Sequence, residues 1–575
     1  MSNRLREKDL LVEIDRLKEL LAEAQSSRPY GLVWEDKPEQ FDADADNAVP
    51  VLETKGGKFK DVILDPDSDH NVLIEGDNYH ALSVLSFTHK GKIDLIYADP
   101  PYNTGNNSWR YNNDYVDKDD IYRHSKWLSF MQRRLTLAHQ LLADTGVFVL
   151  TIDDYEIFDV GMLLDKIFGE QNRIGIVAIE VNPRGRTTNQ FFATSHEYIL
   201  FYAKDAAKAV VDFRDLTEEQ AGAFDLEDET SRYRLLPFRR SGGLSTREER
   251  PNSFYPIYFH QKTGRIDIKP FTGAAAILPI DGDGRERVWR QTKPSLAAAI
   301  ERGDMIVKPG RRGFTVLMKD RIKDGRKPKT IWVDPQYDAS THGTVLLQQI
   351  FNGKRKLFDY PKSLPAVVDT IELLIGSNPN AIVLDFFAGS GTTGHAVLQL
   401  NKRDGAERRF ILCTNNENNI CEDVTFERIK RVMKGYTTPK GEKIAGLGGN
   451  LTYLKTAFVK KELKVGLSDE AKLELTRRAN LILSLRENTF TPVAATDHYE
   501  ITQSPYRLTG VYFSENKSEL IALLDRLKAM AGEKIVTVYV FAWEKGAYKK
   551  GVSGYDFTFE DIPEPLVEVY QAIGL

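Results

Sequence analysis

The stretch Ala381-Ile-Val-Leu-Asp385-Phe-Phe-Ala-Gly389-Ser-Gly391-Thr-Thr-Gly394 decides the fold of this chain. Its apolar start predicts a buried strand over 381–386, and the residues around its last glycine predict the start of a helix over 393–401. The glycines of the intervening turn tolerate dihedrals that bring the backbone close to a ligand. The segment therefore predicts an α/β domain with a ligand site at the end of this strand.

The spacing of these glycines leaves more than one interpretation open. Gly389, Gly391 and Gly394 match G-x-G-x-x-G, the fingerprint of dinucleotide-binding folds, so an NAD-dependent oxidoreductase is one alternative. An ordinary strand-to-helix turn is another. The segment is not a P-loop, because no lysine follows the last glycine.

Strands and helices alternate over two parts of the chain on either side of a different region. Apolar runs of strand length are followed by amphipathic stretches, which predicts a parallel sheet covered by helices on both faces. The expected elements are strand 71–75, helix 79–88, strand 93–98, helix 124–143, strand 146–152, helix 155–168, strand 198–202, helix 363–376, strand 381–386, helix 393–401 and strand 410–413.

A second motif, Asp99-Pro100-Pro101-Tyr102, follows the strand predicted over 93–98. Proline has no N–H group, so the segment offers acceptors, namely the Asp99 carboxylate and the Pro100 carbonyl. Two acceptors aimed at the hydrogens of an exocyclic amine, such as N6 of adenine, would localise the lone pair on that nitrogen. Tyr102 can stack on a base that has left the duplex. Taken alone, the motif is also compatible with a rigid turn.

Positive charge is concentrated in one region of an acidic chain. The whole chain has a net charge of −5, but residues 231–330 contain 23 Lys and Arg against 10 Asp and Glu, a local charge of +13. Such a module is typical of a protein that meets a polyanion, although a solvated basic face would look the same. Six arginines of the module are predicted to contact DNA: Arg239, Arg240, Arg247, Arg250, Arg311 and Arg312.

Other classes of protein are disfavoured by what the sequence contains. Cys413 and Cys421 are the only cysteines, which argues against a disulfide framework and a zinc site, so we expect no metal. No run of about 18 apolar residues suits a membrane span. The first 21 residues are charged throughout, unlike a signal peptide. We therefore expect a cytoplasmic protein.

The order of the two motifs around the basic region resembles that of the β-group DNA amino-methyltransferases. More narrowly, the chain is similar to the modification (Mod) subunit of type III restriction–modification systems. Asp-Pro-Pro-Tyr, rather than Ser-Pro-Pro-Tyr, is similar to enzymes that act on adenine. The segments that carry the resemblance are Tyr30–Glu35, Asp99–Gly105, His124–Met131, Ser195–Leu200 and Arg250–Ile257.

The resemblance implies an α/β fold: a Rossmann-like S-adenosylmethionine-dependent methyltransferase sheet, an inserted target-recognition domain and a small C-terminal α/β domain. The implied domains are an N-terminal helix within 1–30, the first methyltransferase half over 31–205 with the catalytic motif, the target-recognition domain over 206–345, the second methyltransferase half over 346–465, and the C-terminal domain over 466–575.

The resemblance also assigns roles to single residues. Asp99, Pro100, Pro101 and Tyr102 correspond to the catalytic motif. The residues implied to bind the cofactor, S-adenosylmethionine, are Asp385, Phe386, Phe387, Gly389, Gly391, Lys362, Glu417 and Asp77. Lys362 would meet the methionine carboxylate. Glu417 comes slightly late for a ribose-binding acid, and Asp77 could instead cap the helix predicted after it.

The expected partners are double-stranded DNA, from which one adenine is flipped, a second copy of the chain, and a helicase-nuclease (Res) subunit. Helix 3–25, with a stripe of Leu10, Ile14, Leu17 and Leu21, and the domain over 466–575 could serve assembly, or could simply pack on the catalytic body. A solitary methyltransferase and a non-catalytic DNA-binding protein are the remaining alternatives.

Overall fold

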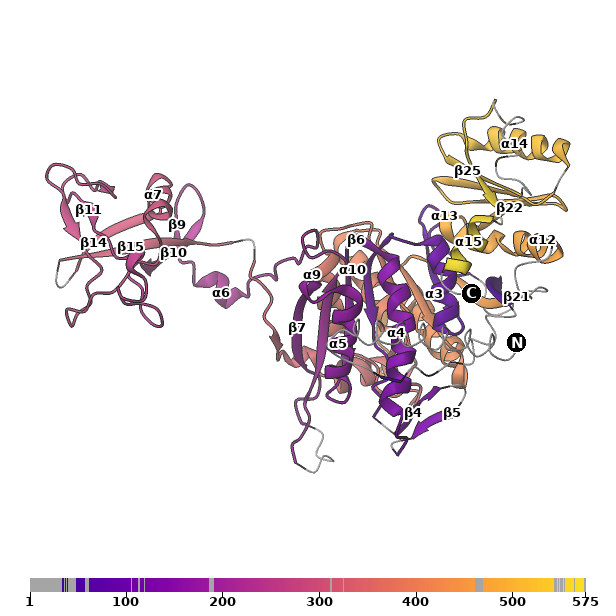
Figure 1. Cartoon of the computed structure of the whole chain (residues 1–575), viewed down its shortest axis with the longest axis horizontal. Helices are drawn as coiled ribbons and strands as arrows, with labels where there is room; N and C mark the ends of the chain where they lie inside the picture. The colour runs from indigo at the N-terminus through magenta and orange to yellow at the C-terminus, as the bar shows by residue number, and fades with distance from the viewer. Residues whose placement is uncertain are drawn as a thin grey trace, which may run out of the picture. The chain divides into compact units, whose positions relative to one another are not determined.

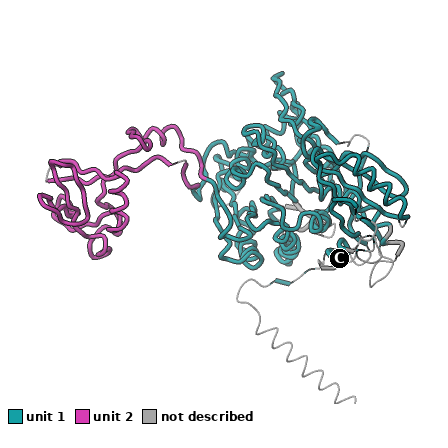
Figure 2. Tube along the Cα trace, turned by 90° about the horizontal axis from the view of Figure 1, so that it is seen from above, with its two compact units in different colours: residues 1–212, 329–575 teal, residues 213–328 magenta. Residues whose placement is uncertain are grey.

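The computed structural model divides into two compact units, residues 1–212 with 329–575 and residues 213–328 (Figure 2). The described residues are Trp34, Glu35, Lys37, Glu39 and 48–572, apart from 57–60, 105, 112–113, 118, 186–190, 311–312, 324, 461–468, 515, 542–545, 547, 549–551, 553 and 563. The helix predicted over 3–25 lies outside them. None of the described helices is long and apolar enough to cross a membrane.

A ten-stranded sheet forms the centre of the first unit (Figure 1). In spatial order its strands are β1 (Ala48–Thr54), β21 (Asn450–Lys460), β2 (His70–Glu75), β18 (Arg409–Thr414), β17 (Ile382–Asp385), β3 (Ile93–Ala98), β6 (Leu142–Ile152), β8 (His196–Ala203), β7 (Arg173–Glu180) and β16 (Ile331–Trp332). The six strands from β21 to β6 run parallel, and all of them except β21 are among the predicted strands.

The sheet is mixed, so the prediction of a purely parallel sheet was wrong at both ends. β1 runs antiparallel to β21, and β8 runs antiparallel to both β6 and β7. The described residues between β7 and β8 contain no helix, which is the usual crossover between parallel strands. Because β8 is reversed, its first residues lie beside the carboxyl ends of the parallel strands, with Tyr198 opposite Ile152.

Helices cover both faces of the sheet, which confirms the predicted layering. One hydrophobic core packs the first group of helices against the sheet and a second core packs the other group. The first group is α3 (Asn78–Thr88), α4 (Arg123–Leu141) and α5 (Ile157–Phe168). The second is α8 (Leu346–Ile350), α9 (Leu364–Ile375), α10 (Thr392–Asp404) and α11 (Glu427–Lys434).

A topological switch point lies between β17 and β3, which are hydrogen-bonded neighbours. From β17 the chain passes through α10 to β18 on one side. From β3 it passes through α4 to β6 on the other side. Ligands of open α/β sheets bind outside the carboxyl ends of the strands at such a point.

The second unit has its own small core, built around Phe238, Trp289 and Leu296. Its residues, 213–328, fall inside the predicted target-recognition range of 206–345. Its elements are α6 (Glu218–Gly222), α7 (Lys293–Glu301), a four-stranded antiparallel sheet of β14 (Met305–Gly310), β15 (Gly313–Arg321), β10 (Arg232–Pro237) and β9 (Leu226–Glu227), and a three-stranded sheet of β12 (Ile266–Asp267), β11 (Ile257–Phe259) and β13 (Ala275–Ile277).

The C-terminal part of the first unit forms a second, five-stranded sheet with a core of its own. Its elements are α12 (Asp469–Arg478), α13 (Asn480–Glu487), β22 (Thr491–Ala495), β23 (Tyr499–Gln503), β24 (Arg507–Tyr512), α14 (Lys517–Ala531), β25 (Ile535–Phe541), β26 (Thr558–Ile562) and α15 (Glu564–Ala572). The parallel strands β24 and β25 are connected through α14. Leu475, Ile482 and Leu566 pack into the core beneath α3.

The remaining short elements connect these layers. They are β4 (Asn106–Tyr111) and β5 (Asp114–Asp117), a hairpin that follows β3, and β19 (Gly435–Thr437) and β20 (Lys443–Ala445), a hairpin that follows α11.

Candidate active site

The motif Asp99-Pro100-Pro101-Tyr102 begins one residue after β3, on the switch-point edge of the sheet. Thr151, at the end of neighbouring β6, donates a hydrogen bond from its hydroxyl to Asp99 Oδ1 over 2.6 Å. The indole nitrogen of Trp127 on α4 donates to the carbonyl of Pro101 over 2.7 Å. Two buried elements therefore hold the motif, and its backbone carbonyls and carboxylate are fixed before any ligand arrives.

The residue after the motif, Asn103, is held in a left-handed conformation with φ of 53°. Asparagine adopts this region more easily than most residues. Its amide donates a hydrogen bond to Glu156, whose Oε1 also lies 2.6 Å from Nδ1 of His124. Burial raises the pKa of Glu156 to about 8, so this carboxyl is protonated at neutral pH. Together these contacts fix the chain direction after Tyr102.

Asp159 extends this cluster, with its Oδ2 3.8 Å from Nδ1 of His124. Ligand atoms of His124, Glu156 and Asp159 lie within 4.8 Å of one another, the one group of metal-ligand spacing found among the described residues. Sequence spacing does not reveal it, because the residues come from the start of two different helices.

The buried side chain of Lys362 links the catalytic motif to β8, a strand far from the motif in the sequence. The ammonium of Lys362, just before α9, lies 3.1 Å from Asp99 Oδ1 and 2.6 Å from Glu197 Oε2. It also contacts the hydroxyl and the ring of Tyr102. The Tyr102 hydroxyl donates to Glu197 Oε2 over 3.0 Å. Glu197 stands at the reversed start of β8 and is a functional candidate that motif spacing missed.

The charges of this cluster depend on one another. Burial raises the pKa of Asp99, and the nearby Lys362 ammonium partly opposes that rise. Burial works against the charge of Lys362, but Asp99 and Glu197 outweigh it, so the pKa of this lysine is raised and it stays protonated. Burial raises the pKa of Tyr102 well above its usual value, so the phenol remains a hydrogen-bond donor.

The glycine-rich loop lies on the other side of the switch point, at the end of β17. Asp385 stabilises the turn: its carboxylate accepts the backbone N–H of Phe387 over 2.9 Å and the hydroxyl of Thr393 over 2.6 Å. Burial raises the pKa of Asp385 to about 7, and the Asp99 charge adds to the rise. The two predicted motifs are therefore close enough to influence each other electrostatically.

Two glycines of the loop have no room for a side chain. Gly389 has φ of 48°, and a Cβ there would meet Phe358 Cζ at 2.9 Å. Gly391, which precedes α10, has φ of 78°, and a Cβ there would meet Thr425 Cγ2 at 3.3 Å. Phe358, four residues before Lys362, thus packs against the glycine loop. The glycine-rich loop also contains two aromatic residues, of which Phe386 is buried and Phe387 is half-buried. The ring centroid of Phe387 lies 6.0 Å from that of Phe130.

The acid predicted for the ribose, Glu417, begins a short 3-10 turn after β18 and is exposed. A second acid that sequence reasoning missed, Glu75, ends the neighbouring strand β2. Its carboxylate is buried, pairs with Lys55 at 2.8 Å and accepts a hydrogen bond from Tyr453. Burial opposes the charge of Glu75, but Lys55 and Tyr453 outweigh it and lower its pKa.

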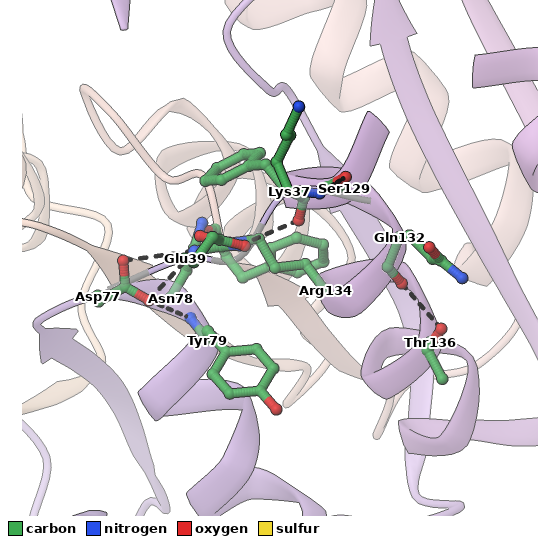
Figure 3. A network of polar contacts seen from close by, with 11 residues as sticks. Lys37, Glu39, Asp77, Asn78, Tyr79, Ser129, Gln132, Arg134 and Thr136 are labelled. Carbon is green, nitrogen blue, oxygen red and sulfur yellow. Dashed lines mark hydrogen bonds and ion pairs between the residues drawn. The ribbon is translucent and has the colours of Figure 1, made fainter. Parts of the chain in front are cut away.

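Asp77 caps the start of α3, which was the alternative to cofactor binding for this residue. It belongs to a polar network at the start of that helix (Figure 3). It accepts the backbone N–H of Tyr79 over 2.7 Å and lies 3.4 Å from the guanidinium of Arg134. Arg134 is buried and also pairs with Glu39 at 3.0 Å. The amide of Asn78, inside the same network, donates to the carbonyl of Phe386 over 3.1 Å.

The predicted DNA-binding arginines lie in the second unit. Arg239 and Arg240 donate to the carbonyls of Ile280 and Gly243. Arg247 pairs with Glu286 at 2.9 Å and is exposed, while Arg250 is half-buried. Arg311 and Arg312 lie outside the described residues. The four described arginines are exposed or half-buried and lie outside the helices and strands of the unit.

A Rossmann-like sheet whose switch point brings an Asp-Pro-Pro-Tyr loop beside a glycine-rich loop defines an S-adenosylmethionine-dependent methyltransferase. The chain belongs to the DNA methylase family: residues 93–426, more than half of the chain, match the family model N6_N4_Mtase. The oxidoreductase alternative is left without support.

Three relatives illustrate the similarity. The type II methyltransferase M.KpnI of Klebsiella pneumoniae is 35% identical over 66% of this chain and 91% of its own length. The EcoPI Mod subunit of Escherichia phage P1 is 32% identical over 64% of this chain and 63% of its own length. The StyLTI Mod subunit of Salmonella typhimurium is 28% identical over 68% and 61%, respectively. The chain thus matches less than two thirds of each of these Mod subunits.

The residues at the switch point fit the cofactor of this class, S-adenosylmethionine. Gly389 and Gly391 hold the loop from Phe386 to Gly391 in left-handed backbone conformations, and the half-buried ring of Phe387 belongs to the same loop. Cys413 and Cys421 are both buried and reduced, so neither takes part in this chemistry as a disulfide.

Proposed function

We propose that this chain is a site-specific DNA adenine-N6 methyltransferase that serves as the modification and specificity subunit of a type III restriction–modification system. The observation that carries this proposal is the acceptor set of Asp99, Pro100 and Pro101, held by Thr151 and Trp127 at the switch point. Acceptors suit an exocyclic amine with two hydrogens, and the Asp-Pro-Pro-Tyr form is similar to that of enzymes that act on adenine.

The protein's contribution to the reaction is to position and polarise the amine. The Asp99 carboxylate and the Pro100 carbonyl accept the two N6 hydrogens of a flipped adenine, which concentrates the lone pair on that nitrogen. Tyr102 stacks on the flipped base. S-adenosylmethionine supplies an activated methyl group when it is bound. No covalent enzyme intermediate is needed, because alignment of the two reactants accounts for the rate.

Residues from both halves of the sheet would hold the donor. Asp385, Phe386, Phe387, Gly389 and Gly391 form the loop after β17. Glu417 was assigned to the ribose from the resemblance, and the buried Glu75 on the neighbouring strand is a second candidate for that contact. Asp77 supports this edge as the cap of α3. The resemblance assigns Lys362 to the methionine carboxylate of the donor.

The second unit would choose the DNA sequence. Arginines of the basic module, among them Arg239, Arg240, Arg247 and Arg250 and, outside the described residues, Arg311 and Arg312, would neutralise phosphates or read base edges. Exchanging residues 213–328 for the matching segment of a related enzyme should change the methylated sequence. Retention of the original target by a well-folded exchange would contradict this role.

We infer the assembly from the Mod relatives. The resemblance implies a Mod homodimer that can also bind a Res helicase-nuclease subunit. A solitary methyltransferase differs only in lacking the Res partner, and M.KpnI, a type II methyltransferase, is similar over most of its own length. Pull-down of a Res-type ATPase by the purified chain distinguishes the two.

One experiment tests the activity itself. Purified protein is incubated with tritiated S-adenosylmethionine and unmethylated duplex DNA, and the DNA is then digested to nucleosides. We expect label in N6-methyladenine, and none with the Asp99→Ala variant. Label in N4-methylcytosine would overturn the choice of base, and transfer of no label to any DNA would overturn the activity.

A further inference from the structure

The ammonium of Lys362 has three hydrogens and three partners within the described site. They are Asp99 Oδ1, Glu197 Oε2 and the hydroxyl of Tyr102. Its side chain is 15% exposed, as is that of Glu197. Each N–H of this lysine therefore already points at a group of the catalytic motif or at the carboxylate behind it.

We propose that Glu197 and Lys362 are a positioning pair for the catalytic motif: Lys362 orients the Asp99 carboxylate, and Glu197 orients both Lys362 and Tyr102. This inference rests on the proposed function and gives Lys362 a role other than binding the donor's carboxylate. Glu197 acts through its neighbours rather than on the base.

The geometry explains what the pair does for Asp99. The described hydrogen bonds and ion pairs of Asp99 all use Oδ1, which Thr151 and Lys362 share. The carboxylate is thereby fixed in rotation, and Oδ2 is the oxygen left for an N6 hydrogen. A carboxylate without Lys362 would turn about its last bond and lose the alignment that the acceptor role demands.

The pair also sets the charge of the site. The Tyr102 hydroxyl contacts Lys362 and Glu197, and Lys362 also pairs with Asp99. With both carboxylates ionised, these two carboxylates and one ammonium have a net charge of −1. During methyl transfer the N6 lone pair forms the bond to carbon, and the electrons of the broken carbon–sulfur bond stay on sulfur. The amine therefore gains positive charge until one of its protons leaves to solvent by way of Asp99, and a site of net negative charge favours the charged state.

Glu197 fixes the second member of the motif. The Tyr102 hydroxyl donates to the same Oε2 that Lys362 approaches, and Lys362 lies 4.6 Å from the centroid of the Tyr102 ring. The ring is thus held at its polar end and along its face. A tyrosine whose ring is fixed in advance loses less conformational freedom when a base stacks on it.

The pH dependence of the rate distinguishes this role from a merely structural one. The groups that face Asp99 are Lys362 before α9, Glu197 on β8, Tyr97 on β3, Tyr102 in the motif, Thr151 on β6 and Asp385 on β17. Asp99 must be ionised to accept a hydrogen. Removal of the Lys362 charge raises its pKa and moves the acid limb of kcat to higher pH, whereas removal of the Glu197 charge moves that limb to lower pH.

The experiment measures kcat, KM and the pH profile for Lys362→Met, Lys362→Arg and Glu197→Gln. We expect kcat to fall about 100-fold in Lys362→Met and Glu197→Gln, with donor and DNA affinity within about threefold of the unmodified protein. The acid limbs should move in opposite directions by about one pH unit. Lys362→Arg keeps the charge, so its acid limb should stay in place.

Lys402 is an exposed lysine in the last turn of α10, and Lys402→Met is the matched control. It should leave kcat, KM and the pH profile unchanged. Loss of donor affinity in Lys362→Met, with normal kcat at saturating donor, would overturn the inference and return this lysine to the cofactor. Acid limbs that stay in place or move together would reduce the pair to a structural role. Failure of the unmodified protein to methylate DNA would instead defeat the proposed function.

Discussion

Asp99 is the residue on which the chemistry depends, and its surroundings tell which consequences its loss should have. Without the Asp99 carboxylate, Lys362 still pairs with Glu197 at 2.6 Å, so no uncompensated charge is left in the site. The fold and the donor loop should therefore survive substitution of Asp99.

We expect Asp99→Ala to lower kcat by about 1000-fold, the upper end of the range for losing one transition-state contact. The donor's dissociation constant, measured by calorimetry, should stay within about threefold. A loss of donor affinity as large as the loss of rate would show that Asp99 holds the cofactor instead of the amine.

The need for glycine at position 391 comes from its backbone conformation rather than from space that the ligand occupies. From the sequence, a side chain here would be expected to fill the ligand's place. The structure directs a Cβ toward Thr425 and Ile429 instead, on a backbone with φ of 78°. A branched residue would be strained in this conformation and would also crowd Thr425.

Gly391→Val should thus weaken donor binding at least 10-fold by distorting the loop, while Gly405→Val serves as its control. Gly405 caps the other end of α10 with φ of 73° and has no atom within 4 Å of a Cβ. Both variants should lose thermal stability, but only Gly391→Val should lose donor affinity in calorimetry. Equal donor affinity in the two variants would argue against the loop as the donor site.

Single residues of the site were predictable only where a motif marks them. Asp99, Tyr102, Asp385 and Lys362 were found because each belongs to a recognisable segment. Glu197 lies in Ser195–Leu200, which carries the family resemblance but offers no chemical reason to single out its acid. Its place in the site follows from the reversed direction of β8, which local periodicity does not encode.

At the scale of elements, the parallel strands and their helices were predictable, because a strand buried on both faces is a continuous apolar run. The strand predicted over 93–98 is β3 with the same bounds, and the helix predicted over 79–88 is α3 to within one residue. The edge strand β1 and its neighbour β21 were missed. They pair with each other across about 400 residues, Val49 opposite Val459, and such long-range pairing leaves little local signal.

The start of α5 offers a test of how an element supports the catalytic loop. Glu156, next to α5, is fully buried and hydrogen-bonded to Asn103. Its pKa of about 8 lies above the ordinary value of 4.5, so folding favours the protonated form. Its stabilising contribution is complete below pH 4.5 and is lost as the pH rises through 8.

Glu156→Gln cannot ionise and keeps an oxygen for Asn103. We expect the free energy of unfolding of this variant, relative to that of the unmodified protein, to be about 2–3 kcal/mol higher at pH 9 than at pH 6. Urea denaturation at the two pH values checks this, and a difference that does not depend on pH would contradict a neutral buried Glu156.

At the scale of the whole molecule, the C-terminal sheet is joined to the catalytic body by more than a linker. Asn488 makes two hydrogen bonds of 2.9 Å with the backbone of His70, which starts β2. Leu475, Ile482 and Leu566 share the core beneath α3. From the sequence alone, removal of residues 466–575 would be expected to spare methylation, and these contacts argue against that expectation.

Truncation after residue 465 should therefore lower the midpoint of thermal unfolding and reduce methylation as α3 loses its cover. Differential scanning calorimetry, with a methylation assay in parallel, checks this. A truncated chain with an unchanged midpoint and full activity would show that the domain serves only assembly.

The way the second unit leaves and rejoins the chain has a consequence for inheritance. Arg214 and Arg326, near its two ends, exchange backbone hydrogen bonds of 2.9 and 2.8 Å, so the ends of the insert lie side by side. Just before it, Asp212 is anchored to α9 through Leu373 and Ser377. Crossovers in the codons on either side of 213–328 can exchange the insert as a cassette without touching a codon for the switch point. With the role in sequence choice proposed for this insert, one such recombination event gives a lineage a new methylation pattern on its genome.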